Sequence, residues 1–176
     1  MKPRAIAVAV LSTLALSSPA AHAQSAPAVN PLDVIPDKMP FDVPYGTPIA
    51  LDRAQAVIAA AIAEAAKHNW KEGVAVVDSG GNLVAFARMD GTQLAAATIA
   101  EHKARTAVTF RRDTKVFETN VQNGLVYQLT LDGVIASRGG IPLVDDGKLI
   151  GAIGVSGATG SQDEVCAKAG AATVNK

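Results

Sequence analysis

The stretch VVDSGGNLVAFARMDG, Val76 to Gly91, sets the fold, because it places two apolar segments on either side of a short glycine-rich connection. Alternating apolar residues predict a buried strand over VAVVD and a second strand over LVAFARM. The connection SGGN has the length of a hairpin turn, and we expect Gly80 and Gly81 to take positive φ angles there. A phosphate-binding loop would instead lead into a helix. We therefore interpret DSGG as a turn and look for the chemistry elsewhere.

Helices are predicted on both sides of this hairpin. Apolar residues at three- and four-residue steps predict a helix from Leu51 to about Lys71, which Gly73 would end. Residues with high helix propensity predict another helix from Leu94 to Phe110, and a shorter helix is expected over residues 113–124. The segment 125–137 is ambiguous, since its pattern fits neither period clearly.

A second hairpin and a last helix complete the pattern. IPLVDDGKLIGAIGVSG predicts a strand from Ile141 to Val144, a turn at DDGK and a strand from Leu149 to Ser156. Ser161 and Glu164 then have the spacing of a capping box. Two hairpins among helices favour antiparallel pairing. The sequence therefore predicts a single α+β domain with a mostly antiparallel sheet between helices.

The N-terminal residues predict a signal peptide for export, followed by an extended, proline-rich arm. Two basic residues, a short apolar run and the A-x-A pattern before Ala23 are typical of a signal peptide over residues 1–23, cleaved after Ala23. A retained membrane anchor is the alternative, which the short apolar run disfavours. Residues 24–50 hold six of the nine prolines and predict an extended arm along the domain 51–176 or along a neighbouring subunit. We expect a periplasmic or secreted protein without stable membrane insertion.

Charge and cysteine content exclude some classes of function. Without residues 1–23 the chain carries 14 Lys and Arg against 16 Asp and Glu. It therefore lacks the excess of positive charge that binding to nucleic acid requires. Cys166 is the only cysteine, so no intrachain disulfide can form, and a buried small residue is its simplest interpretation.

Signatures of catalysis and metal binding are sparse. No G-x-S-x-G, H-x-x-H, H-E-x-x-H or C-x-x-C spacing occurs, and the mature chain would keep only His68 and His102. Asp78, Asp90 and Ser156 are weak catalytic candidates, since no base is visible beside the serine. GVSGATGSQD, residues 154–163, runs from a strand into a helix and could hold an anion, although packing and capping explain it equally well.

A haem needs fewer ligands than a zinc site: one axial ligand, an apolar slot and cations for the propionates. His102 lies in the middle of the second predicted helix, beside Lys103 and Arg105, and away from the alanine face that would pack on the sheet. It is therefore exposed, at a subunit interface or in a ligand slot. His68 is expected to favour the helix dipole or to stack near Trp70.

Three ordered segments resemble the GlcG/HbpS family of haem-binding, sometimes haem-degrading, proteins: AVVDSGGNLVAFARMDG, AEHKARTAVTF and GGIPLVDDGKLIGAIGVSGATGSQDEVCAKAG. The resemblance extends from about Leu51 to the C-terminus. It implies an α/β/α sandwich with a profilin-like antiparallel sheet, and homo-oligomers that are often ring-like or octameric. Among the matching polar positions, structure alone accounts least well for Arg88, Asp90, Lys103 and Thr106. The axial ligand does not follow from the resemblance.

We therefore expect an exported haem-binding protein, in haem or iron handling or in oxidative-stress sensing with a sensor protein as partner. His102 is the expected axial ligand of the haem iron, and Lys103, Arg105 or Arg88 would pair with the haem propionates. Thr106 is a further expected haem-binding residue. Two alternatives stay open. One is an enzyme that acts on another small molecule at a subunit boundary, and the other is an accessory oligomeric protein without its own ligand. The sequence does not decide whether the protein is an enzyme.

Overall fold

The computed structural model describes residues 33–39 and 41–175. The predicted signal peptide therefore lies outside the described residues. The chain divides into a unit that ends at Asp37, of which residues 33–37 are described and exposed, and a compact unit over Lys38–Lys176. No helix in the described part is both long and apolar enough to cross a bilayer.

A four-stranded sheet forms the middle layer of the compact unit. Its strands are β1 (Gly73–Asp78), β2 (Leu83–Arg88), β3 (Gly140–Asp145) and β4 (Lys148–Ser156). Every neighbouring pair is antiparallel, in the order β2-β1-β4-β3. Each predicted hairpin therefore forms, and the two central strands join the hairpins to each other.

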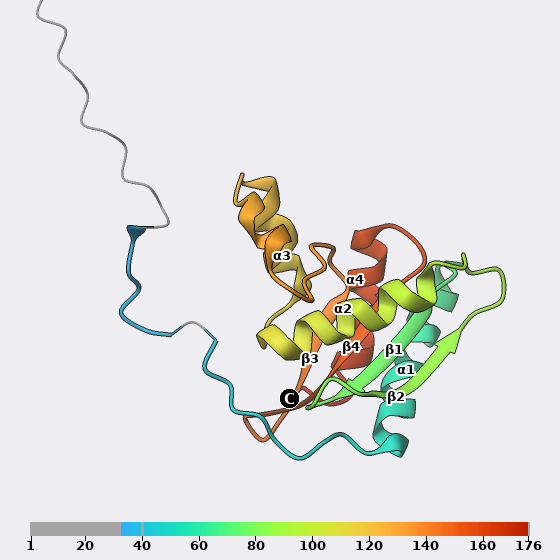
Figure 1. Ribbon diagram of the computed structural model, residues 1–176. Coiled ribbons are helices and arrows are strands. Elements are labelled where there is room, and N and C mark those ends of the chain that lie inside the picture. The colour runs from blue at the N-terminus through green and yellow to red at the C-terminus, as the bar shows by residue number, and fades with distance from the viewer. Residues whose placement is uncertain (1–32, 40, 176) are drawn as a thin grey trace, which may run out of the picture. The chain divides into compact units, whose positions relative to one another are not determined.

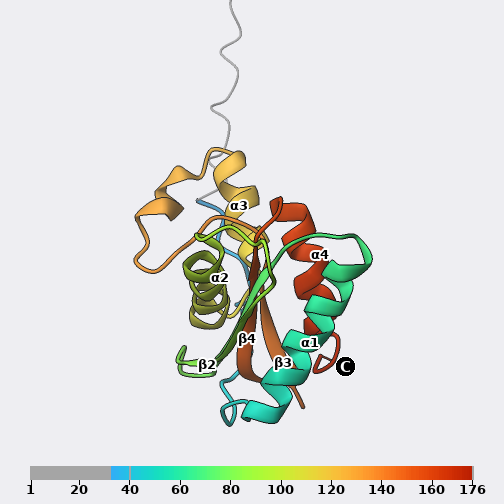
Figure 2. The ribbon, with the colours of Figure 1, turned by 90° about the vertical axis from the view of Figure 1, so that its right-hand side faces the viewer.

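Helices cover both faces of this sheet. Helices α1 (Leu51–Lys67) and α4 (Gly160–Ala171) lie side by side on one face, and α2 (Ala96–Phe110) lies alone on the other (Figures 1 and 2). The predicted α+β sandwich with a mostly antiparallel sheet is thus confirmed. Because α2 has no second helix beside it on that face, one side of α2 remains open at the surface.

Two cores fill the space between the layers. The larger one joins the sheet to α1 and α4, and includes Val57, Val74 and Ile153. The smaller one joins the sheet to α2, whose contacting residues there are Ala104, Ala107 and Val108. Small side chains let α2 approach the sheet backbone closely. A Cβ on Gly154 of β4 would overlap the Ala100 carbonyl oxygen.

The DSGG turn is built as predicted, with one difference. The Asp78 carboxylate accepts hydrogen bonds from the backbone N–H groups of Gly80 (2.8 Å) and Asn82 (2.9 Å), which closes the turn from inside. Gly81 has a φ of 80°, in the left-handed region. The expectation of a positive φ at Gly80 was wrong, since a single left-handed residue suffices here.

Helix ends differ from the sequence predictions because contacts outside the helix decide them. Helix α1 ends at Lys67, four residues before the predicted end, and Asn69 takes the left-handed conformation there (φ 56°). Gly73 begins β1 rather than ending α1. The predicted helix start at Leu94 is also two residues early, since α2 begins at Ala96.

The start of α4 also differs from the prediction. Its capping box is formed by Thr159 and Gln162, not by Ser161 and Glu164. The helix therefore begins at Gly160, and Glu164 is free to pair with cations of neighbouring elements instead. The S-x-x-E spacing of Ser161 and Glu164 therefore does not mark the helix start, which the neighbouring pair Thr159 and Gln162 caps instead.

The second half of the predicted arm lies along its own domain. The backbone of Gly46 donates to Leu149 O (2.8 Å), Leu149 N donates to Pro44 O (2.8 Å), and Ile49 N donates to Ile150 O (2.9 Å). Strand β1 pairs with β4 only as far as Gly151. The arm therefore takes up the edge of β4 that β1 leaves open.

The ambiguous segment becomes part of a small helical projection. Helix α3 (Thr114–Gln122) is followed by the short 3₁₀ helix η2 (Val126–Thr130), and the two pack on each other beyond one end of the sandwich (Figure 1). The chain returns to the sheet through Arg138, which binds Glu118 of α3.

Candidate functional site

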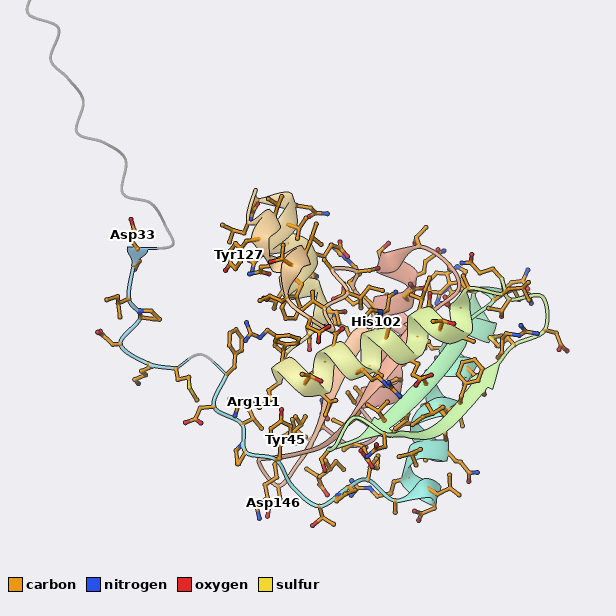
Figure 3. The ribbon with its side chains drawn as sticks, in the orientation of Figure 1. Asp33, Tyr45, His102, Arg111, Tyr127 and Asp146 are labelled. Carbon is orange, nitrogen blue, oxygen red and sulfur yellow. The ribbon has the colours of Figure 1, made fainter. Side chains whose placement is uncertain are left out.

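The open side of α2 carries a shallow depression. Its lining residues are Thr98, Glu101, His102 and Arg105, and its volume is about 220 Å³. These residues recur at three- and four-residue steps, so they share one face of the helix, and the buried alanines face the sheet. Figure 3 shows His102 near the middle of α2. The sequence thus predicted correctly that His102 points away from the alanine face.

The depression combines one imidazole with one ion pair. The Arg105 guanidinium lies 2.7 Å from the Glu101 carboxylate, one helical turn away. His102 is partly buried, and its ring has no hydrogen-bonding partner among the described residues. Both ring nitrogens are therefore available to a ligand, and a cation stands beside them.

Lys103 and Thr106 are buried on another side of α2. The Lys103 ammonium lies 2.6 Å from the Asp163 carboxylate and donates to Val155 O at 3.0 Å. The Thr106 hydroxyl donates to Gly133 O and accepts from Ile135 N, which holds the chain between η2 and β3. Neither residue lines the depression, so the structure does not bring them to His102.

The other predicted residues lie apart from the depression. Arg88 and Ser156 are both paired with Gly73, so they flank one end of β1. Asp78 lies at the opposite end of β1, where its carboxylate closes the turn. Asp90 is exposed and makes no ion pair with another described residue. The structure therefore brings His102 and Arg105 together at the depression and places the remaining candidates away from it.

Packing and capping account for the loop GVSGATGSQD. Thr159 caps α4, and the Asp163 carboxylate accepts from Ala158 N at 3.2 Å while binding Lys103. A carboxylate already occupies the place that an anion would take. We find no support for an anion site there.

The remaining histidine and the cysteine behave as expected. His68 stacks on Trp70 with ring centroids 4.3 Å apart, and its ring lies 3.3 Å from the Glu64 carboxylate. Cys166 is fully buried, and burial raises the pKa of its thiol to about 12. Within the described ranges, no three His, Cys, Asp or Glu side chains cluster as metal ligands.

The sequence interpretation missed Glu72. This residue directly precedes β1, its side chain is fully buried, and its carboxyl group interacts with Lys103 and Asp163. The only signal in the sequence is a glutamate directly before the buried run GVAVV, where a charged residue is not expected.

Known proteins resemble this chain in sequence and in fold. Over 103 residues the chain is 49% identical to Protein GlcG of Escherichia coli (strain K12), which covers 58% of this chain and 77% of GlcG. A crystal structure of an HbpS double mutant from Streptomyces reticuli superposes with a TM-score of 0.68 and 30% identity, over 85% of this chain and all of that one. A crystal structure of a PduOC:haem complex gives a TM-score of 0.66 and 28% identity, over 73% and 96% of the two chains.

The family comparison agrees with these relatives. The model of the family described as "Haem degrading protein HbpS-like" matches residues 49–172, which include the whole sandwich and the depression on α2. The predicted GlcG/HbpS resemblance is confirmed by this match. The chain belongs to the HbpS-like family of haem-related proteins.

Proposed function

We propose that the protein binds haem against the open side of α2, with His102 as an axial ligand of the iron. The observation that carries this proposal is the free imidazole at the α2 depression, with the Arg105 cation one turn away. An imidazole nitrogen is the commonest protein ligand of haem iron, and it must lack a competing hydrogen bond to serve.

Arg105 fits the second requirement of a haem site, a cation for a propionate. Its guanidinium is about half exposed, and among the described residues its one ion pair is with Glu101, a neighbour on the same helix. Such exposed pairs contribute little to stability, so exchanging Glu101 for a propionate carboxylate costs little. Guanidinium also binds carboxylates through two parallel hydrogen bonds, which fixes their orientation.

The volume of the depression points to a second copy of the chain. Pockets for small molecules usually enclose about 300–1,000 Å³ and bury most of the ligand. The depression on α2, about 220 Å³, falls below this range and is open. We therefore propose that a haem covered by α2 on one side is covered by a second subunit on the other, so that binding accompanies homo-oligomer formation.

The relatives support haem as the ligand. The family description names haem, and the structurally similar PduOC was crystallised as a haem complex. Two histidines of this chain lie within the described residues: His102 lines the depression on α2, and His68 stacks on Trp70. We propose on this basis a role in haem or iron handling.

Histidine variants test the ligand assignment. Haem added to His102→Ala should lose the sharp Soret shift of the wild-type complex. His68→Ala is the matched control, because its ring stacks on Trp70 away from the depression. An unchanged Soret band in His102→Ala, or its loss in His68→Ala alone, would contradict the assignment.

We propose further that the protein is exported. The support is the signal-like pattern of residues 1–23, with its A-x-A site before Gln24. N-terminal sequencing of the protein from the periplasm of a bacterial host should begin at Gln24. A full-length protein that remains with the cytoplasm or membrane would refute the proposal.

A further inference from the structure

Glu72 is a buried carboxyl group that lacks an ordinary partner. Its side chain is fully buried, and neither carboxyl oxygen accepts a hydrogen bond from a described donor. The space beside it is tightly filled. A Cβ on Gly157 would come within 2.7 Å of Glu72 Oε2, so glycine is required at that position. An ionised carboxylate in such a place is costly unless something neutralises it.

The neighbours of Glu72 supply one positive charge for two acids. Asp163 of α4 lies within hydrogen-bonding reach of the Glu72 carboxyl group. The Lys103 ammonium of α2 already pairs with Asp163 at 2.6 Å and is itself 1% exposed. Lys103 can balance one carboxylate. The second acid therefore needs a proton.

A proton on Glu72 also resolves its missing hydrogen bond. Two carboxylates can only accept, whereas a carboxylic acid donates one O–H to its neighbour. The ionised form is better stabilised in Asp163 than in Glu72, because the Asp163 carboxylate binds Lys103 and accepts a hydrogen bond from Ala158 N. The proton consequently belongs on Glu72, with Asp163 as its acceptor.

We infer that Glu72 is held as a neutral carboxylic acid that donates a hydrogen bond to Asp163, and that loss of this proton is a pH-sensitive switch in the interior. The switch lies where the start of β1, α2 and α4 meet. Once Glu72 ionises, two carboxylates compete for one ammonium. The contact between α2 and α4 is then weakened from inside.

The electrostatics of the surroundings agree with this inference. Burial, the charge of Asp163 and the hydrogen bond with Asp163 together raise the pKa of Glu72 from an ordinary 4.5 to about 8, while Lys103 and the backbone N–H of Ala158 oppose them. The other titratable group that faces Glu72 is Cys166 of α4, whose own pKa is raised to about 12. The thiol therefore stays neutral and does not take the proton.

The direction of the pH effect follows from the raised pKa. In the unfolded chain Glu72 ionises near its ordinary value, so the folded state binds the extra proton between about pH 4.5 and 8. The contribution of Glu72 to stability is complete below that range. It is lost progressively as the pH rises to about 8.

Infrared spectroscopy tests the protonation directly. At neutral pH the wild-type protein should show the carbonyl band of a protonated carboxylic acid, which Glu72→Gln lacks and which disappears as the pH rises through about 8. Glu64→Gln is the matched control and should keep the band, because Lys67 and His68 lower the pKa of that partly buried glutamate. Identical spectra of wild type and Glu72→Gln at neutral pH would overturn the inference.

A second variant and a stability series test the partner and the switch. In Asp163→Asn, Lys103 becomes free to pair with Glu72, so the acid band should vanish at neutral pH. A band that persists there would overturn the assignment of Asp163 as acceptor. The melting temperature of the wild type should fall from pH 5 to 8 more steeply than that of Glu72→Gln, and parallel curves would contradict the switch. No haem is needed for either result.

Discussion

Lys103 carries its charge into the interior of the protein. Its ammonium is enclosed between β4 and α4, where it binds Asp163 and the carbonyl of Val155. Its neighbour His102 faces outward, since successive helical residues point about 100° apart. Lys103 therefore holds the layers together, while the preceding residue, His102, presents a possible metal ligand at the surface.

Removal of the lysine should be strongly destabilising. Lys103→Met leaves acidic groups buried without their cation, and breaking one side of a buried pair costs about 3–5 kcal/mol. Urea unfolding measures the change. Arg105→Gln, which breaks an exposed pair on the same helix, should cost less than about 1 kcal/mol. Similar losses in the two variants would contradict the structural role of Lys103.

Gly154 is a second residue on which the packing of α2 depends. Gly154→Ala places a methyl group against the Ala100 carbonyl and 2.6 Å from Ala104 N, both backbone atoms. The variant should lose about 1–3 kcal/mol or more, as overpacked cores do. The control is Gly80→Ala, whose nearest neighbours are the ends of two flexible side chains. Thermal unfolding that shows equal stability for the two variants would refute the close contact.

At the level of elements, the arm completes the sheet. Tyr45 forms a parallel bridge with Leu149, and its hydroxyl lies 3.1 Å from the carbonyl oxygens of Val108 and Thr109. Arg112 stacks over Phe41, and Arg111 donates to Val43 O. Residues 41–50 therefore bind the C-terminal end of α2 and the start of β4 together (Figure 3).

Truncation tests this function of the arm. A chain that begins at Leu51 should melt at a lower temperature than one that begins at Lys38, because it loses the backbone hydrogen bonds to Leu149 and Ile150. The chain from Lys38 is the matched control and should match the longer protein. Equal melting temperatures for the two truncated chains would show that the arm adds no stability.

Helix α3 depends on an acid-sensitive contact. Arg138 donates to Glu118 through Nε at 2.7 Å and through its backbone N at 2.8 Å, and these bonds hold the pKa of Glu118 below its ordinary value. Stability from this contact is present above the ordinary carboxyl pKa and is lost as the pH falls through the lowered one. Acidification should therefore destabilise the wild type more than Glu118→Gln, as followed by circular dichroism. Equal acid sensitivity would contradict the contact.

The sequence predicted the elements well and their ends poorly. Periodicity places α2 because this helix buries one side, which includes Ala104. The central strands β1 and β4 are instead recognised as short apolar runs, because both of their faces are buried. The ends depend on partners distant in sequence: the α4 cap lies in a loop beside Asp163, and α1 stops where the chain must turn into β1. For the site, helical spacing correctly placed His102 outward. It could not show that Lys103 meets an acid 60 residues away, nor that Glu72 lies behind it.

At the level of the whole molecule, the sandwich leaves one helix side uncovered. Two helices shield one face of the sheet, whereas α2 alone shields the other (Figure 2). The depression around His102 lies on α2. Lys103 holds the buried side of α2 through its ion pair with Asp163, and the side of α2 that carries the depression remains available to a ligand. A rigid helix that presents the imidazole of His102 suits the proposed ligation of a haem.

The most direct measurement is a haem titration of the chain from Gln24 onward, followed by visible absorption. Haem binding at α2 predicts a sharp Soret shift that saturates at one haem per chain or per pair of chains, because each chain contributes the α2 depression with the unpartnered imidazole of His102. A weak shift that never saturates would mean that haem adheres only to apolar surface. That result would contradict a haem site on α2.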